Sequence, residues 1–329
     1  MASIKDVAKL AGVSVAAVSK YLKTPQNMRE ETRNRIAGAI EALNYRPNPL
    51  AQSLRTGRTN IIAIAIPEVE NPYFSNMFKL LQAYCEQRGL LAVLLKNANA
   101  EQTKNTAGIL KSGLVDGVIC YDEGQADALI REVAVSVPVV KVGPVSDNHY
   151  AATVGIDLRT GINKLCSHLE DVGVRRVGYI GPDKDFSSMQ KIGAIRHYCE
   201  KSGLYLDPDV FLTDCTDYSS GYDCAKKLLQ SGVPVPDVII VESDMIALGV
   251  LKGLTEGGLQ IPGDIRLTGY DNTDISQMSN PSLTSVHIPM EEICTCALNM
   301  LCQLMNGNEV TPVLFQTDLK IRTSTLPPE

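Results

Sequence analysis

Two patterns of apolar and polar positions divide the chain. Within residues 1–46, apolar residues recur at helical spacing, most clearly at Ile36, Ile40 and Leu43, which share one helix face. From Ile61 onwards, short continuous apolar runs each precede a segment of helical pattern. These runs are IIAIAI, LLAVLL, GVIC, VPVVKV, RRVGYIG, DVIIVE and IRLTGY. Continuous β-branched runs are typical of parallel strands covered on both faces. The patterns therefore predict a small all-α head and an α/β body of doubly wound parallel sheets in two lobes.

The head is predicted to contain three short helices. We place them at about 4–10, 15–22 and 29–43. Ser3 and Ser14 precede the first two helices as side-chain caps, and Gly12 ends the first. Two short helices joined by a tight glycine turn, with a third that closes the core, form a helix-turn-helix domain.

The segment YRPNPLAQSLRTGRTN separates head and body. It is too short and too polar to bury a core of its own, so we expect a linker with a helical centre at 50–54 that orders conditionally. The predicted domains are thus a helix-turn-helix domain at 1–46, a hinge at 47–60 and a body at 61–329.

Charge is distributed unevenly along the chain. Residues 1–60 hold ten Lys and Arg against four acidic residues, a net charge of +6, whereas the whole chain has −6, so the remainder carries −12. A small basic head on an acidic body is the asymmetry expected when only the head meets phosphate.

The N-terminus and the cysteines indicate the compartment. MASIKDVAKL has charges where a secretion signal needs an apolar core, and no apolar run approaches the roughly 20 residues that span a bilayer. The nine cysteines include no CxxC pair. We therefore expect a cytoplasmic protein without a membrane segment, with reduced and mostly buried thiols and no zinc site. Cys294 and Cys296, as C-x-C in a predicted helix, are a weak metal signal.

Motifs of enzymes are missing from the sequence. It contains no GxxxxGK[ST], GxSxG or HExxH, and its four histidines are far apart. Acidic residues follow several predicted strands, where ligands of α/β folds bind. They are suited to general acid chemistry or, equally, to hydrogen bonds with the hydroxyls of a bound small molecule. These residues are Asp122, Asp157, Glu242, Asp244 and Asp271.

Longer motifs extend over the whole chain. IKDVAKLAGVSVAAVSKYL, followed by REETRNRIAGAIEALNYRPNPLAQSLRTGRTNIIAIAIPEVENPYF, closely resembles the LacI/GalR family of bacterial transcription regulators. GIDLRTG, RRVGYIG, SDMIALGVLKGLTEGGLQIPGDIRLTGYDNTD and NPSLTSVHIP resemble the effector-binding body of that family in order and spacing. The resemblance begins at about residue 3 and continues to the C-terminus.

The resemblance implies a homodimer whose heads bind a pseudo-palindromic operator DNA, with a periplasmic-binding-protein-like body that closes on a small effector, a sugar or related metabolite. No cofactor is implied. The chain of family members crosses three times between lobes, here near Ile156, Ile288 and Thr317. Lobe one then comprises about 61–156 and 290–316, and lobe two about 157–289 and 317–329.

The second helix of the head is the implied recognition helix. On a helical wheel Val18 and Leu22 point into the core and Lys20 points almost opposite. The resemblance places base contacts at Val15, Ala16 and Lys20, where small apolar side chains can touch thymine methyl groups and Lys20 can donate to guanine. The alternative is that Ala16 is neutral surface and Lys20 meets a phosphate. Contacts that set register rather than sequence are expected at Ser14, Ser19, Asn27 and Tyr45.

The hinge is expected to add contacts in the minor groove. Leu54 matches the family leucine that wedges into a central base step; the alternative is a core leucine. Arg55 and Arg58 are expected at phosphates.

Eight residues of the body form the implied effector site. They are Tyr73, Phe74, Asp122, Asp157, Gln190, Ser243, Asp244 and Asp271. The alternative role of Tyr73 and Phe74 is to pack between the lobes. The alternative role of Asp244 is to cap a helix. Gln190 stands where many members have an arginine that grips effector hydroxyls, and Leu158 and Ser243 replace common asparagines, so the usual sugar is in doubt.

The sequence therefore predicts an operator-binding regulator, most simply a repressor, controlled by a small molecule. One alternative is control by a partner protein docked on lobe one, as in family members of carbon catabolite control. A solute-binding protein without a transcription role and an enzyme are the remaining alternatives.

Overall fold

The computed structural model describes residues 2–46, 57–96, 100–122, 127–145 and 152–327. The chain divides into two compact units, Met1–Thr59 and Asn60–Glu329. The first is all-α and the second α/β, as the apolar patterns predict. Among the described residues, no helix is long and apolar enough to cross a membrane.

The helices of the first unit are α1 (Ile4–Ala11), α2 (Val15–Lys23), the 3₁₀ turn η1 (Pro25–Asn27) and α3 (Glu30–Ala42). Of these, α1 begins and ends, and α2 begins, at the predicted caps. Ser3 Oγ accepts from Asp6 N at 3.4 Å, while Asp6 Oδ2 accepts from Ser3 N at 2.8 Å, which forms a capping box. Gly12 ends α1 with φ 64°, and Ser14 Oγ accepts from Ala17 N at 3.1 Å. These three cap predictions are confirmed.

The core of the head lies where the three helices meet. Val7, Val18 and Ile36 are fully buried there. The prediction that Leu22 also faces this core is wrong, since Leu22 is 37% exposed. Tyr21, the residue before it, is partly buried against the cluster instead.

The second unit contains two sheets, of which the first is parallel throughout. In sheet order its described strands are β11 (Val313–Gln316), β5 (Ala152–Asp157), β4 (Val139–Pro144), β3 (Gly117–Tyr121), β1 (Ile61–Ile66) and β2 (Leu91–Lys96). The helices that accompany it are α5 (Pro72–Gln87), α6 (Ala100–Lys111), α7 (Asp127–Val133) and α13 (Met290–Met305).

The second sheet is parallel except for its last strand. In sheet order its described strands are β12 (Asp318–Lys320), β10 (Thr284–His287), β9 (Arg266–Asp271), β8 (Val238–Val241), β6 (Arg176–Ile180) and β7 (Tyr205–Leu212), with β12 antiparallel. Its helices are α8 (Leu158–Asp171), α9 (Phe186–Cys199), α10 (Tyr218–Gln230), α11 (Asp244–Glu256) and α12 (Asp274–Met278).

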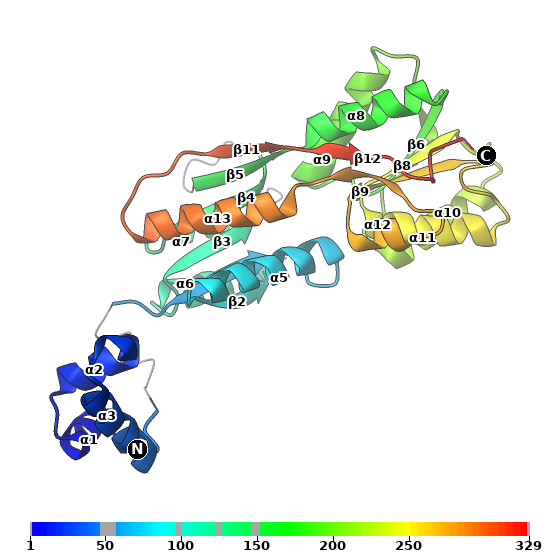
Figure 1. Ribbon diagram of the computed structural model, residues 1–329. Coiled ribbons are helices and arrows are strands. Elements are labelled where there is room, and N and C mark those ends of the chain that lie inside the picture. The colour runs from blue at the N-terminus through cyan, green and yellow to red at the C-terminus, as the bar shows by residue number, and fades with distance from the viewer. Residues whose placement is uncertain (1, 47–56, 97–99, 123–126, 146–151, 328–329) are drawn as a thin grey trace. The chain divides into compact units, whose positions relative to one another are not determined.

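Helices cover both faces of each sheet, as β1 illustrates. Ile62, Ile64 and Ile66 pack on the side of α5 and α13, which lie side by side (Figure 1). Ala63 and Ala65 pack on the side of α6 and α7. Side chains alternate between the faces of a strand, so a continuous apolar run is required where both faces are buried.

Segments that pass between the two sheets are fastened to one another. Thr317, between β11 and β12, donates from Oγ1 to the Asp157 carbonyl at 2.7 Å and accepts from Gly161 N at 2.8 Å. A Cβ on Gly161 would lie 2.4 Å from Val286 Cγ1 and 2.5 Å from Thr317 Oγ1. Glycine is therefore required at this point of the GIDLRTG motif.

The cysteines differ from the prediction at one pair. Cys215 and Cys224 form a disulfide, whereas all nine thiols were expected to be reduced; the other seven are free. Cys224 lies on α10 and Cys215 on the segment before that helix, so the local fold brings the two thiols together. Their spacing in the sequence matches no motif that would predict a disulfide. On α13, Cys294 Sγ points to the Met77 carbonyl and Cys296 Sγ lies 3.8 Å from Met300 Sδ, so the C-x-C pair diverges.

The close approach at Gly161 yields a first prediction. Gly161→Ala is expected to lower the free energy of unfolding by about 1–3 kcal/mol, because the methyl group overpacks the crossing. Urea denaturation of the full chain measures it. The matched control is Gly108→Ala in α6, where no described atom lies within 4 Å of the new Cβ and alanine favours the helix. Equal effects of the two substitutions would show that the crossing tolerates a side chain.

Candidate functional site

The exposed face of α2 is the candidate surface for DNA bases. Val15, which is 37% exposed, joins the exposed Ala16 and Lys20 on this face, while Val18 faces the core. Because Ser14 uses its Oγ to cap the helix, the first turn is held rigidly behind these side chains. The face offers two small apolar groups and one ammonium, a surface that can approach a major groove closely.

The other predicted DNA residues lie in different surroundings. Asn27 is exposed on η1, whereas Ser19 is half-buried and Tyr45 packs partly on the core of the head. Tyr45 therefore also has a structural role. Arg58 is within the described residues; Leu54 and Arg55 lie outside them, and the wedge and phosphate contacts stay predictions.

A pocket of ≈ 730 Å³ lies in the body where the two sheets meet. Asp157 and Gln190, both predicted effector residues, line it together with Arg159 and His197. Gln190 Nε2 donates to the Val145 carbonyl at 3.3 Å, so this side chain on α9 bridges to the end of β4. The remaining lining residues are Val145, Ile156, Leu158, Met189, Gly193 and Leu314.

Asp157 serves the fold and retains some binding capacity. Its carboxylate caps α8, with Oδ1 accepting from Arg159 N at 3.0 Å and from Thr160 N at 3.3 Å, and Oδ2 accepting from Thr160 Oγ1 at 2.6 Å. A carboxylate has about four acceptor sites. Oδ2 can therefore accept a further hydrogen bond from a hydroxyl in the pocket.

Asp122 and Asp244 lie in the interior and cannot reach a bound molecule in this conformation. Asp122 forms an ion pair with Lys141 at 2.9 Å, with both side chains almost completely buried. Asp244 is fully buried and accepts from Thr273 N at 2.7 Å and from Ser285 Oγ at 2.6 Å. Burial raises the pKa of Asp244 to about 6, although these hydrogen bonds oppose the shift. A carboxylate without exposed surface must be satisfied internally, so neither side chain faces a ligand in this conformation, and their effector contacts stay predictions.

Ser243, Tyr73 and Phe74 also have structural roles. Ser243 caps α11 by accepting from Ile246 N at 3.3 Å. The rings of Tyr73 and Phe74 are 4% and 5% exposed and pack edge-on against Tyr121, with centroids 5.7 and 4.9 Å away. The two rings therefore pack inside lobe one in this conformation, whereas the alternative named from the sequence was packing between the lobes.

The turn after β9 keeps Asp271 as a candidate ligand residue. Asp271 is half-buried at the carboxyl end of the strand. Its φ of 96° and the φ of 53° at Asn272 place two successive non-glycine residues in the left-handed region. Strained backbone of this kind concentrates at functional sites.

A buried ion pair beside this turn was missed as a site feature. Lys191 Nζ lies 2.5 Å from Glu242 Oε1 and 3.9 Å above the ring centre of Tyr270, with Lys191 and Glu242 side chains 7% and 12% exposed. Burial alone would lower the pKa of Lys191, but the Glu242 carboxylate, together with Tyr270 and Asp271, outweighs burial and holds this pKa above its usual range. Glu242 follows an apolar run and was noted as an acid; no sequence signal pointed to Lys191 as its partner.

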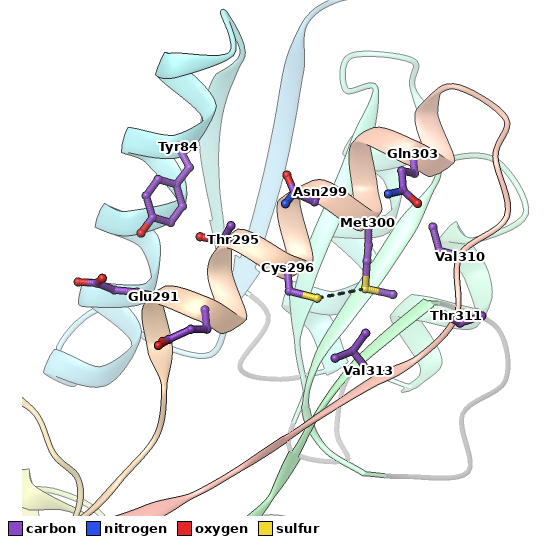
Figure 2. A pocket seen from close by; sticks show the side chains of 11 residues that line it. Tyr84, Glu291, Thr295, Cys296, Asn299, Met300, Gln303, Val310, Thr311 and Val313 are labelled. Atoms are coloured by element: carbon purple, nitrogen blue, oxygen red, sulfur yellow. Dashed lines mark hydrogen bonds between the residues drawn. The ribbon is translucent and has the colours of Figure 1, made fainter.

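A second pocket of ≈ 660 Å³ lies on lobe one and was not predicted. Figure 2 shows α13 along it, with Tyr84 on α5 at one side and Val310 and Val313 at the other. Arg88 Nη2 donates to Asn299 Oδ1 at 2.8 Å and so ties α5 to α13 at this pocket. The remaining lining residues are Glu291, Glu292, Thr295, Cys296, Met300, Gln303 and Thr311.

Comparison with known proteins identifies both units. Residues 3–48 match the model of bacterial regulatory proteins of the lacI family, and residues 166–325 match that of a periplasmic binding protein-like domain. The chain is 29% identical to catabolite control protein A of Staphylococcus epidermidis over 94% of each chain. It is also 29% identical to the HTH-type transcriptional repressor PurR of Pasteurella multocida over 98% of each.

Solved structures agree with this assignment. The lac repressor dimer bound to operator and the anti-inducer ONPF superimposes with a TM-score of 0.86 at 25% identity, covering 99% of both chains. The complex of the transcriptional regulator CelR with cellobiose gives 0.72 at 25% identity, covering 98% of this chain and 100% of the other. The chain therefore carries a domain of the lacI family of bacterial regulatory proteins at its N-terminus and a periplasmic binding protein-like domain after it.

The Lys191–Glu242 pair yields a second prediction. Lys191→Met is expected to lower the free energy of unfolding by about 3–5 kcal/mol, because Glu242 stays buried without its cation. Adding Glu242→Gln should restore part of this loss, as measured by urea denaturation. Lys111→Met is the control: the Lys111–Glu132 side chains are 38% and 48% exposed, and such pairs contribute about 0–1 kcal/mol. A loss no larger than that of the control would contradict the prediction.

Proposed function

We propose that the protein is a cytoplasmic transcription regulator, acting as a repressor, that binds a pseudo-palindromic operator as a homodimer. A small polar metabolite of the carbohydrate type, bound between the lobes, controls its affinity for DNA. The observation that carries this proposal is the exposed, weakly polar face of α2 on a basic head, joined to a two-lobed body with a pocket where the sheets meet.

DNA recognition is divided between base contacts from α2 and contacts with the DNA backbone and minor groove. Val15 and Ala16 touch thymine methyl groups, and Lys20 donates to a guanine. Ser14, Ser19, Asn27 and Tyr45 then set the register, while Leu54, Arg55 and Arg58 act in the minor groove and at phosphates. Bound sugars in relatives, such as cellobiose in CelR, support a carbohydrate as effector.

A third prediction follows from the division between base contacts and phosphate contacts. The preferred operator is first selected from a random pool of duplex DNA, and binding is then followed by fluorescence anisotropy over a series of salt concentrations. Lys20→Ala should cost about 1–3 kcal/mol at the base pair it contacts and relax specificity there. Arg58→Ala should weaken binding to all sequences evenly and flatten the salt dependence.

Lys201→Ala, an exposed residue of lobe two, is the control and should change neither quantity. Absence of DNA binding at low salt would contradict the proposed function. Identical behaviour of Lys20→Ala and Arg58→Ala would contradict only the division of contacts.

Effector binding makes a fourth prediction. A thermal-shift screen with cellobiose, sucrose, polyols, sugar phosphates and nucleosides should identify at least one stabilising ligand. A ligand at a hundred times its Kd stabilises the folded state by about 2.7 kcal/mol. Asp271→Ala and Asp157→Ala should abolish the shift, whereas Asp223→Ala, at an exposed position of α10, should preserve it.

The pocket on lobe one favours a second candidate, in which a partner protein docked there controls the regulator. The pocket is lined by mixed polar and apolar side chains of α5, of α13 and of the segment that leads into β11. A relative is named catabolite control protein A, which is consistent with this alternative. A screen in which no metabolite shifts the melting temperature, together with intact DNA binding, would favour it over a metabolite effector.

A further inference from the structure

The turn at Asp271 and Asn272 must be held by its surroundings. Two successive non-glycine residues with φ of 96° and 53° are costly, and such conformations persist only where neighbouring groups over-determine them. The contacts of Asn272 and of Thr273, which follows it, supply this support.

Asn272 is held at three of its polar atoms. Its backbone N donates to Ser285 Oγ at 3.0 Å. Arg322 Nη2 donates to Asn272 Oδ1 at 2.5 Å, and Asn272 Nδ2 lies 3.0 Å from His287 Nδ1. The side-chain amide thus lies between a guanidinium and an imidazole, one from the C-terminal segment and one from the end of β10.

Buried hydrogen bonds fix the groups behind the turn. Ser285 Oγ, which accepts from Asn272 N, donates to Asp244 Oδ1 at 2.6 Å. Asp244 Oδ2 accepts from both N and Oγ1 of Thr273, at 2.7 and 2.9 Å. Arg322 is itself fixed because its Nη1 donates to the Leu283 carbonyl at 2.7 Å. The turn therefore rests on a connected network.

The donor and acceptor roles in this network follow from Arg322. A guanidinium only donates, so the Asn272 atom facing it is the carbonyl oxygen and the atom facing His287 is the amide nitrogen. Asn272 Nδ2 carries only donors, so His287 Nδ1 has to accept. This requires a neutral imidazole with its proton on Nε2. In a protonated His287, Nδ1 would also carry a proton and would point it at the N–H of the Asn272 amide.

We propose that Asn272 is a positioning residue for Asp271, and that its hold depends on a neutral His287, so that the effector site is sensitive to pH. This inference rests on the proposed function, in which Asp271 binds the effector. When His287 takes up a proton, the Asn272 amide loses its acceptor and the left-handed turn loses a support.

Charged groups face His287 from several elements. They are Lys320 and Asp318 of β12, Glu292 of α13, Arg322 of the C-terminal segment, and Asp271, its partner in register on β9. Burial, with the cations Lys320 and Arg322, lowers the pKa of His287 against the opposing effect of the acids. The unfolded chain therefore takes up the proton first as pH falls. The stabilisation is fully present above about pH 6.5 and is lost as pH falls from there through the folded-state pKa.

The fifth prediction is tested by nitrogen NMR of the full chain labelled at histidine, with the His287 signals assigned by His287→Gln. Wild type should show the Nε2–H tautomer and a pKa below the ordinary value. Asn272→Asp should raise the pKa of His287 by about one unit or more, since a carboxylate favours the protonated ring. Asn308→Asp, the same charge change at an exposed position of lobe one, should leave it unchanged.

Asn272→Leu separates positioning from ionisation. It removes the amide that holds the turn, so a crystal structure of the variant should show Asp271 outside the left-handed region. An Nδ1–H tautomer in the wild type, a His287 pKa that Asn272→Asp leaves unchanged, or an unchanged Asp271 φ in Asn272→Leu would overturn the proposal. None of these measurements uses DNA or effector, so a failure of the proposed function would be recognised separately.

Discussion

The segments that cross between the two sheets have to lie against one another, and the organisation of the body depends on this constraint. Thr317 joins two crossings by hydrogen bonds to Asp157 and Gly161, at a point where even one methyl group would collide. The apolar core continues through Ile156 and Leu158 into both lobes. Because the crossings are packed this closely, the pocket lined by Asp157 and Gln190 forms directly beside them.

Burial determines whether a carboxylate at a strand end is satisfied inside the protein or remains available to the pocket. Asp122 and Asp244, which have almost no exposed surface, are satisfied by an ion pair and by hydrogen bonds inside the lobes. Asp157 caps a helix and retains acceptor capacity towards the pocket. Desolvation therefore reduces the number of polar groups available to an effector below what the spacing of acids along the chain suggests.

The fold of the head depends mainly on local caps and a small apolar core. Its helices are determined locally by Ser3, Gly12 and Ser14, and a short apolar stripe is sufficient to close three helices into a core. The exposed face of α2 is poor in hydrogen-bonding groups because Val15 and Ala16 are small and apolar. Such a face can approach DNA closely, which makes the shape of the groove and the methyl groups of thymine available to it.

Periodicity and caps were sufficient to predict the fold class and seven strands of the body, since each of those strands is a short continuous apolar run, although β2 at the sheet edge is only partly covered. The edge strand β7 escaped prediction because its sequence, YLDPDVFL, contains a proline and faces solvent in part. In the head, Leu22 was assigned to the core, but it is 37% exposed and Tyr21 packs against the core instead.

Motifs placed the acids at the strand ends, but their roles depended on contacts between residues distant in sequence. Lys191 meets Glu242 across 51 positions, and Arg322 meets Asn272 across 50. The sequence by itself determined the helices of the head and the seven strands with continuous apolar runs, because caps, turns and apolar periodicity act over a few residues. Only the tertiary structure decided which polar groups are satisfied inside the protein and which face a ligand, because burial and hydrogen bonding depend on neighbours that the fold alone brings together.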